Sequence, residues 1–218
     1  MSKSSTRMFT CPKCGKDYEI EIWESINVAL DPDLREKLFH NEIFKVECPH
    51  CHDVYQVVHP CLYHDPENKL MVYLVDDAIE KELEANPKIP FEVIPGYTYR
   101  YCKKIMEFVE KVRILEEGLD DRIVEMAKMF CEKQIVDSKR ATLEEIEFTV
   151  YNTKKDNSVE IITVLKEEPV RMQLNYEQFE EIFLREEDGY EIEPNRFVRI
   201  NRDWMLERAT REYVKNIS

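Results

Sequence analysis

Two cysteine pairs with the same spacing constrain this chain more than any other feature. The first pair lies in Cys11-Pro12-Lys13-Cys14-Gly15 and the second in Cys48-Pro49-His50-Cys51-His52. Two cysteines three positions apart in a tight turn direct both sulfur atoms to one side, so each pair supplies two corners of a tetrahedron. The proline between them fixes φ, and Gly15 allows the unusual backbone angle after the turn. We predict one structural zinc ion, bound by Cys11, Cys14, Cys48 and Cys51.

Each pair lies between strand-like segments, and this arrangement is typical of a zinc ribbon, in which two hairpin turns face each other across the metal. Cys14 and Cys48 enclose 33 residues, more than the roughly 15–20 of compact zinc sites, and a helix predicted over 31–41 accounts for the excess. The rival interpretation is a pair of redox dithiols. A thioredoxin-like site needs its cysteine pair at a helix start, whereas both pairs here precede strands. Four thiolates also leave no open position on zinc, which favours a structural metal over a catalytic one.

The polarity pattern predicts an α+β protein with two domains. Residues 1–137 should form a zinc-ribbon-like, antiparallel β domain with a helical insertion. The alternation over 18–23 indicates a half-buried strand, and Asp31-Pro32 is a typical helix start. The other elements predicted in this part are strands at 44–47, 54–58, 70–75 and 91–94, and a short helix from 77 to about 85.

A helical hairpin is predicted over residues 98–136. Cys102, Ile105 and Val109 recur at three- and four-residue steps, as on the apolar face of a helix. Gly118 should end this first helix and Asp120 should begin the second. A connection this short makes the two helices antiparallel neighbours.

Residues 138–218 should form a second, small α+β domain. The pattern predicts three strands at 145–151, 159–165 and 170–174, a helix at 176–184, a short strand at 197–200 and a final helix at 203–211.

Composition limits the functions open to the chain. Its formal net charge is −14, and phosphate backbones need a positive surface, so nucleic acid is not an expected partner. Six basic residues occur over 196–215 among acidic ones, a pattern typical of a solvated, paired face. The first residues have no apolar core, so they do not form a signal peptide. No apolar run reaches the roughly 18–20 residues of a membrane span. We therefore expect a cytoplasmic protein with reduced thiols.

The chain also resembles the bacterial CpXC-domain proteins, named for paired Cys-Pro-x-Cys motifs. The resemblance spans about residues 8–136. It includes both cysteine motifs, the segments 22–28, 62–65 and 71–73, and the helical join 113–122. It implies that the zinc assignment carries over to Cys11, Cys14, Cys48 and Cys51. The resemblance does not imply any particular enzymatic reaction.

Four histidines near the second cysteine pair allow another interpretation. His50, His52, His59 and His64 could form a second metal site, with Cys61 and Asp65, and thus a hydrolytic enzyme. The simpler interpretation is that they are surface histidines or hydrogen-bond partners of the zinc thiolates. His52 could also replace a cysteine ligand. The remaining thiols are predicted to be buried, apolar groups; they are Cys61, Cys102 and Cys131.

The sequence therefore favours a cytoplasmic zinc protein that acts as a protein-interaction or regulatory module. It shows no catalytic motif, and we do not expect an enzyme. We expect the partner to be another protein or a second copy of the chain, and we expect neither nucleic acid nor a membrane as a partner. The sequence does not identify a small-molecule ligand. Two alternatives remain: a metal-dependent enzyme using His52, His59 and His64, and a redox- or zinc-responsive switch.

Overall fold

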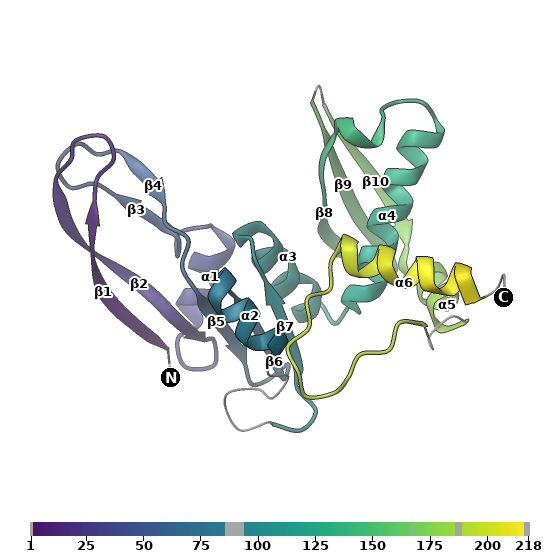
Figure 1. Ribbon diagram of the computed structural model, residues 1–218, viewed down its shortest axis with the longest axis horizontal. Coiled ribbons are helices and arrows are strands. Elements are labelled where there is room, and N and C mark those ends of the chain that lie inside the picture. Colours follow the sequence, from purple (N-terminus) through teal and green to yellow (C-terminus); the bar gives the residue numbers. More distant parts are fainter. Residues whose placement is uncertain (1, 86–93, 167, 186–188, 216–218) are drawn as a thin grey trace. The chain divides into compact units, whose positions relative to one another are not determined.

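The computed structural model describes residues 2–85, 94–166, 168–185 and 189–215 (Figure 1). These residues form six α-helices and three β-sheets, which confirms the predicted α+β class. None of the helices in these ranges is long and apolar enough to cross a bilayer. Most of the strand predicted at 91–94 lies outside the described residues.

The chain divides into two compact units that differ from the predicted division at residue 138. The first unit contains Met1–Val112 and Pro194–Val198, and the second contains Arg113–Glu193 and Arg199–Ser218. Helix α4 (Asp121–Asp137) falls in the second unit because its apolar side chains pack against two strands of that unit. The short segment at 194–198 joins the first unit through a parallel bridge between Arg100 and Val198. The predicted strand at 197–200 thus contributes only this bridge.

The first unit is built on a five-stranded sheet with the order β1-β2-β5-β6-β7. Its strands are β1 (Lys3–Thr10), β2 (Asp17–Asn27), β5 (Cys61–Asp65), β6 (Leu70–Leu74) and β7 (Thr98–Cys102). The predicted antiparallel arrangement holds for β1 with β2 and for β5 with β6, but β2 and β5, and likewise β6 and β7, run parallel. Parallel neighbours need a crossover connection. Between β2 and β5 this connection contains α1 (Pro32–Phe39) and a separate antiparallel pair, β3 (Lys45–Glu47) and β4 (Val54–Gln56).

The first of the two helices predicted over 98–136 begins later than the sequence indicated. Thr98–Cys102 pairs with Leu70–Leu74 as strand β7, so Cys102 lies at a strand end and not on a helix. Helix α3 (Ile105–Glu116) follows it, and the join to α4 has the predicted Gly118, with φ of 69°. Strand β7 has side chains buried on both faces, and such a strand shows no alternation of polarity that could reveal it.

Side chains on both faces of β6 are buried, and this makes β6 the centre of the first unit. Met71 packs with Leu83 of α2 (Asp77–Ala85), with Tyr99 of β7 and with Phe197. Val72 points to the opposite face and is fully buried there. The sheet is therefore covered on both sides around β6, while β1 and β2 extend beyond this core and carry the first cysteine pair.

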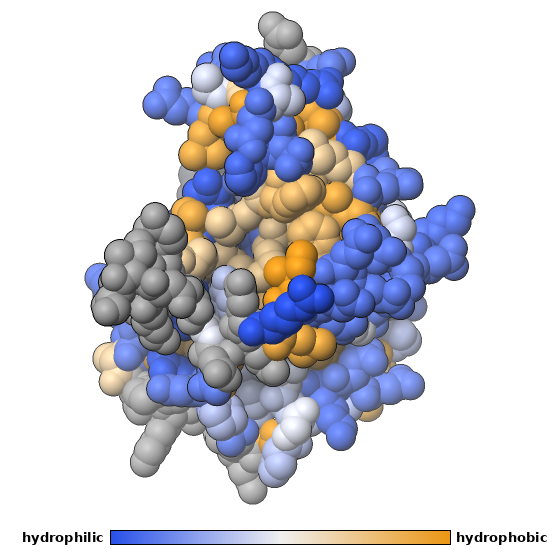
Figure 2. All heavy atoms as spheres, turned by 90° about the vertical axis from the view of Figure 1, so that its right-hand side faces the viewer, coloured by the Kyte–Doolittle hydropathy of each residue, from blue (hydrophilic) through white to orange (hydrophobic). Residues whose placement is uncertain are grey.

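The second unit is a three-stranded antiparallel sheet covered by helices. Its strands are β8 (Ile146–Lys155), β9 (Ser158–Leu165) and β10 (Pro169–Asn175), in the order β10-β9-β8. They match the predicted strands, and α5 (Tyr176–Arg185) and α6 (Arg202–Lys215) match the predicted helices. Figure 2 shows hydrophobic residues gathered in the middle of one face of this unit. Exposed apolar side chains of α4 and α5 include Phe130, Ile182 and Leu184.

Candidate metal centre

The two cysteine pairs lie in two turns of the same local fold. Cys11 and Cys14 lie in the turn between β1 and β2, and Cys48 and Cys51 lie in the turn between β3 and β4. In the first turn the residue after the second cysteine donates its N–H to the Cys11 carbonyl over 2.9 Å, and the matching bond to Cys48 is also 2.9 Å. The repeated motif therefore folds the same way twice, as the repeated spacing predicted.

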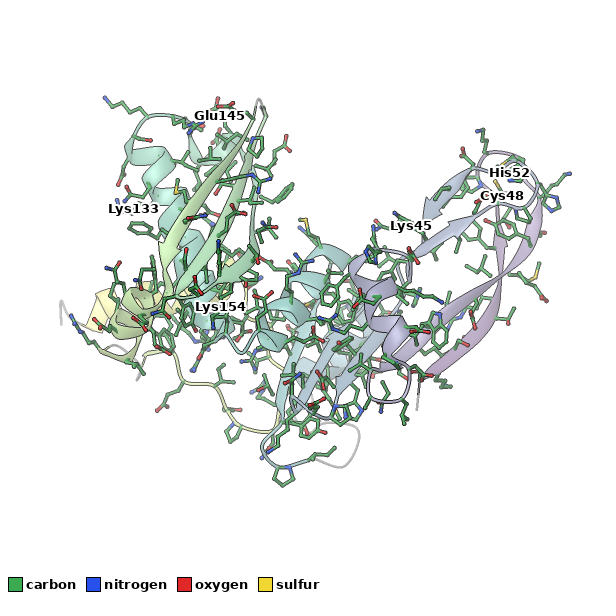
Figure 3. All side chains as sticks on the ribbon, turned by 180° about the vertical axis from the view of Figure 1, so that it is seen from behind. Lys45, Cys48, His52, Lys133, Glu145 and Lys154 are labelled. Atoms are coloured by element: carbon green, nitrogen blue, oxygen red, sulfur yellow. The ribbon has the colours of Figure 1, made fainter. Side chains whose placement is uncertain are left out.

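The four sulfur atoms of these turns form one cluster, which lies at the tip of the hairpins where Figure 3 labels Cys48. All four Sγ atoms lie within 4.8 Å of one another. Cys11 Sγ is 3.6 Å from Cys51 Sγ, and Cys14 Sγ is 3.7 Å from Cys48 Sγ. A tetrahedral metal with metal–sulfur bonds of about 2.3 Å places its sulfurs about 3.8 Å apart, whereas a disulfide needs about 2.05 Å. The cluster could therefore hold a metal ion.

The local environment shifts the pKa values of Cys11 and Cys51 in opposite directions. Burial raises the pKa of Cys11, but the hydrogen bond with Tyr55 and the hydrogen bonds from backbone amides outweigh it and lower the value to about 6. The Asp53 amide lowers the pKa of Cys51, but burial and the neighbouring cysteines raise it to about 12. Ionisation of one thiol thus opposes ionisation of another. A bound dication removes this opposition, because it stabilises all four thiolates together.

Side chains around the cluster connect the two turns. Lys13 Nζ of the first turn donates to Asp53 Oδ1 of the second over 2.9 Å. The Tyr55 hydroxyl donates to Asp53 Oδ2 over 2.7 Å and lies 3.4 Å from Cys11 Sγ. Hydrogen bonds of this kind orient metal ligands and adjust their charge.

Two tyrosines near the cluster, Tyr18 and Tyr55, were not predicted as part of the site, although the sequence contains a signal for them. Each second cysteine is followed four residues later by a tyrosine, Tyr18 in one turn and Tyr55 in the other. The Phe9 ring lies between both, with centroids 5.6 Å from Tyr18 and 5.9 Å from Tyr55. The Tyr18 hydroxyl is buried without a hydrogen-bond partner, and burial together with the nearby cysteine charges raises its pKa. The repeated motif is therefore Cys-Pro-x-Cys followed by a tyrosine.

The four histidines do not form a second metal site. Among the described residues, the four cysteines are the only group of three or more cysteine, histidine or acidic side chains with metal-binding proximity. His52 Nδ1 lies 2.7 Å from Glu47 Oε1, and His59 Nδ1 lies 3.2 Å from its neighbour's carbonyl. His64 Nε2 instead faces the Tyr97 hydroxyl at 3.3 Å.

The other three cysteines are buried, as predicted. Cys61, Cys102 and Cys131 are all at most 2% exposed. Burial raises the pKa of Cys61 to about 12 and that of Cys131 to about 12. Both therefore stay protonated and apolar at neutral pH, without the thiolate needed for nucleophilic or metal chemistry.

Comparison with known proteins gave one match. A family model described as "CpXC protein" matches residues 9–128. The matched range contains both cysteine turns, the whole of α3 and the first half of α4. Neither a curated protein nor a solved structure matched the chain.

Proposed function

The chain belongs to the CpXC protein family, and from this premise we propose that it is a zinc-binding protein-interaction module whose metal is architectural. One observation carries the proposal. Four cysteine sulfurs from two matching turns have the mutual distances of a complete tetrahedral ligand set. A metal held by four thiolates has no open position for a substrate or a water molecule, and such closed sites stabilise folds.

Zinc is the metal that this donor set favours. Soft thiolate ligands in a tetrahedral arrangement select zinc or iron over magnesium and calcium. Zinc needs no redox partner, and both turns have the form that a zinc ribbon uses. The zinc-ribbon assignment of the two hairpins is part of this proposal.

The position of the cluster supports an architectural role. The first turn ends the β1–β2 hairpin beyond the sheet core, and the second ends the short β3–β4 pair. Structural zinc contributes on the order of 10 kcal/mol to small metal domains. Here it would fix the two hairpins against each other. The β3–β4 pair, with three residues in each strand, is too short to be stable on its own.

Two observations support the interaction role, one on the histidines of the first unit and one on the surface of the second unit. The histidines considered for catalysis have separate partners, so we assign no catalytic residue and no enzyme activity. Exposed apolar side chains on α4 and α5 are typical of surfaces that bind other proteins. We propose a protein partner, or a second copy, in the cytoplasm.

Metal analysis tests the first half of the proposal. The purified protein should contain one zinc per chain, and elemental analysis will distinguish zinc from iron. A strong chelator should unfold the first unit, measured by circular dichroism and thermal denaturation, and added zinc should restore it. Full stability of the metal-free protein would contradict the architectural role.

Affinity capture from the source cells tests the second half. The bait should be compared with the chain carrying Cys11→Ser, Cys14→Ser, Cys48→Ser and Cys51→Ser. Partners bound by the native protein and lost from the variant would support an interaction module. A second, labile metal required for hydrolysis of a substrate would instead favour an enzyme.

A further inference from the structure

A groove lies between β2 and β3 in the first unit, next to the metal cluster. It has a volume of about 490 Å³ and is lined by residues of both strands and by parts of the connection between them. Figure 3 labels Lys45, the first residue of β3, and Cys48, which follows its last residue. The volume is within the range of ligand-binding sites, about 300–1,000 Å³.

One wall of the groove is an unpaired edge of β2. This strand pairs with β1 along its length but meets β5 only from Ser25 to Asn27. Cys11 N–H donates to the Lys16 carbonyl at the start of the ladder. Hydrogen-bonded and non-hydrogen-bonded pairs alternate in an antiparallel ladder, so Glu19 and Glu21 direct their backbone groups away from β1. Among the described strands, none pairs with this part of β2 on that side.

The facing wall is an unpaired edge of β3. Val57 N–H donates to the Phe44 carbonyl over 2.8 Å, and Cys48 N–H donates to the Asp53 carbonyl over 2.9 Å. The same alternation then places the backbone groups of Glu47 on the edge opposite β4. In the described part of the chain, β3 has β4 as its single strand neighbour. Two open strand edges thus border one groove.

The side chains that line the groove favour a basic occupant. Its carboxylates outnumber its ammonium groups by four to two; the lining includes Glu19, Glu21, Glu42 and Glu47 against Lys37 and Lys45. Along β2, exposed Glu19 and Glu21 alternate with buried Ile20 and Ile22. A strand laid beside β2 would therefore meet carboxylates on one face and apolar side chains on the other.

We propose that this groove binds an extended segment of a partner protein, which adds as a β-strand between β2 and β3 and carries lysine or arginine at alternate positions. Strand addition to an open edge gives affinity through main-chain hydrogen bonds, and the alternate side chains give specificity. The inference rests on the proposed function, because the metal at Cys14 and Cys48 would fix the distance between the two strands that bind the segment.

A synthetic peptide tests the proposal. The probe is a fluorescein-labelled, end-capped octapeptide in which lysine or arginine alternates with valine or threonine. Its binding to the zinc-loaded full chain is measured by fluorescence anisotropy at physiological ionic strength. Glu19→Lys with Glu21→Lys should weaken binding about tenfold or more, because like charges then face each other. The matched control, Glu82→Lys with Glu84→Lys, makes the same charge change at exposed positions of α2 and should leave binding unchanged.

Changes in the peptide provide a test that does not depend on folding of a variant. A probe with N-methyl groups on alternate amides cannot make the main-chain bonds along one edge, so its binding should be lost. A probe with glutamate in place of the basic residues should bind far more weakly.

Four outcomes would overturn the proposal. They are no saturable binding of the basic peptide, equal loss in both charge-reversal variants, undiminished binding of the N-methylated probe, and undiminished binding of the glutamate probe. Zinc content and circular dichroism of the same samples show whether the metal still stabilises the fold. They therefore distinguish a failure of the groove proposal from a failure of the proposed architectural role of zinc. Full zinc with no peptide binding would reject the groove proposal alone.

Discussion

Gly15 and His52 occupy the same position in the two cysteine turns, and both have a positive backbone φ, 69° at Gly15 and 57° at His52. A residue with a side chain pays an energetic penalty in this left-handed region, and glycine avoids it. At His52 the side chain makes a hydrogen bond with Glu47 at the turn's surface. The two turns therefore have the same backbone shape, although different residues occupy this position.

This equivalence gives a prediction for Gly15. A Cβ at this position would meet no atom within 4 Å, so a substitution changes the backbone energy and little else. Gly15→Ala should lower the free energy of unfolding of the zinc-loaded protein by about 1 kcal/mol. Gly15→Asn should cost less, because asparagine tolerates the left-handed region better. Chemical denaturation of the three proteins at saturating zinc checks this, and equal stability of all three would contradict it.

Alkylation of the buried cysteines should report the unfolding of each of the two units separately. In the zinc-loaded protein, Cys61, Cys102 and Cys131 should resist iodoacetamide at neutral pH, because burial prevents access and raises the pKa of Cys61 and Cys131. After chelation, Cys61 and Cys102 should react, because they belong to the first unit, whereas Cys131 of the second unit should stay protected.

Peptide mass spectrometry of the alkylated chain provides the measurement, with denatured protein as the control in which all seven cysteines react. Simultaneous exposure of Cys131 with the other two would show that loss of metal also unfolds the second unit.

Buried His59 should make the protein less stable in mild acid. Burial lowers the pKa of His59, which packs against the Phe44 ring with centroids 5.1 Å apart. The unfolded chain, with a histidine pKa of about 6.5, therefore takes up a proton more readily than the folded chain. This histidine's contribution to stability is complete above about pH 6.5 and is lost as the pH falls toward the lowered pKa.

The variant His59→Phe should remove this part of the pH dependence. The difference in unfolding free energy between the two proteins should change by up to about 1.4 kcal/mol per pH unit below pH 6.5. Taking the difference at each pH cancels the acid sensitivity of the metal site, which both proteins share. A difference that stays constant between pH 7.5 and 5.5 would contradict the prediction.

The second unit should depend on a bond between Tyr151 and Glu117. The buried Tyr151 of β8 donates its hydroxyl to Glu117 Oε2, and Lys154 N–H donates to the same oxygen over 3.2 Å. Tyr151→Phe should lower the unfolding free energy by about 1–2 kcal/mol, because the carboxylate loses a donor at a partly buried position. Glu117→Gln keeps an acceptor oxygen and should cost less. Denaturation followed by a probe in the second unit compares the three proteins.

Local patterns in the sequence were sufficient to predict the cysteine cluster and most elements. The repeated Cys-Pro-x-Cys spacing dictates two turns of one shape, because short-range sterics and hydrogen bonds decide the path of the chain there. Alternating polarity predicted β2, two strand-like runs joined by a polar turn predicted β8 and β9, and the start at Asp31-Pro32 predicted α1. In these cases the interactions that define the element lie within a few residues of one another.

The tertiary structure decided the features that depend on distant partners. Strand β7 and the parallel neighbours of the first sheet arise from pairing across long connections, and a strand buried on both faces has no alternation to reveal it. The assignment of α4 to the second unit depends on the strands that cover its apolar face. The groove between β2 and β3 could also be found only from the structure, because a strand edge is open only where no other strand pairs with it. Sequence therefore determined the turns that could hold the metal, and long-range pairing determined the surfaces around them.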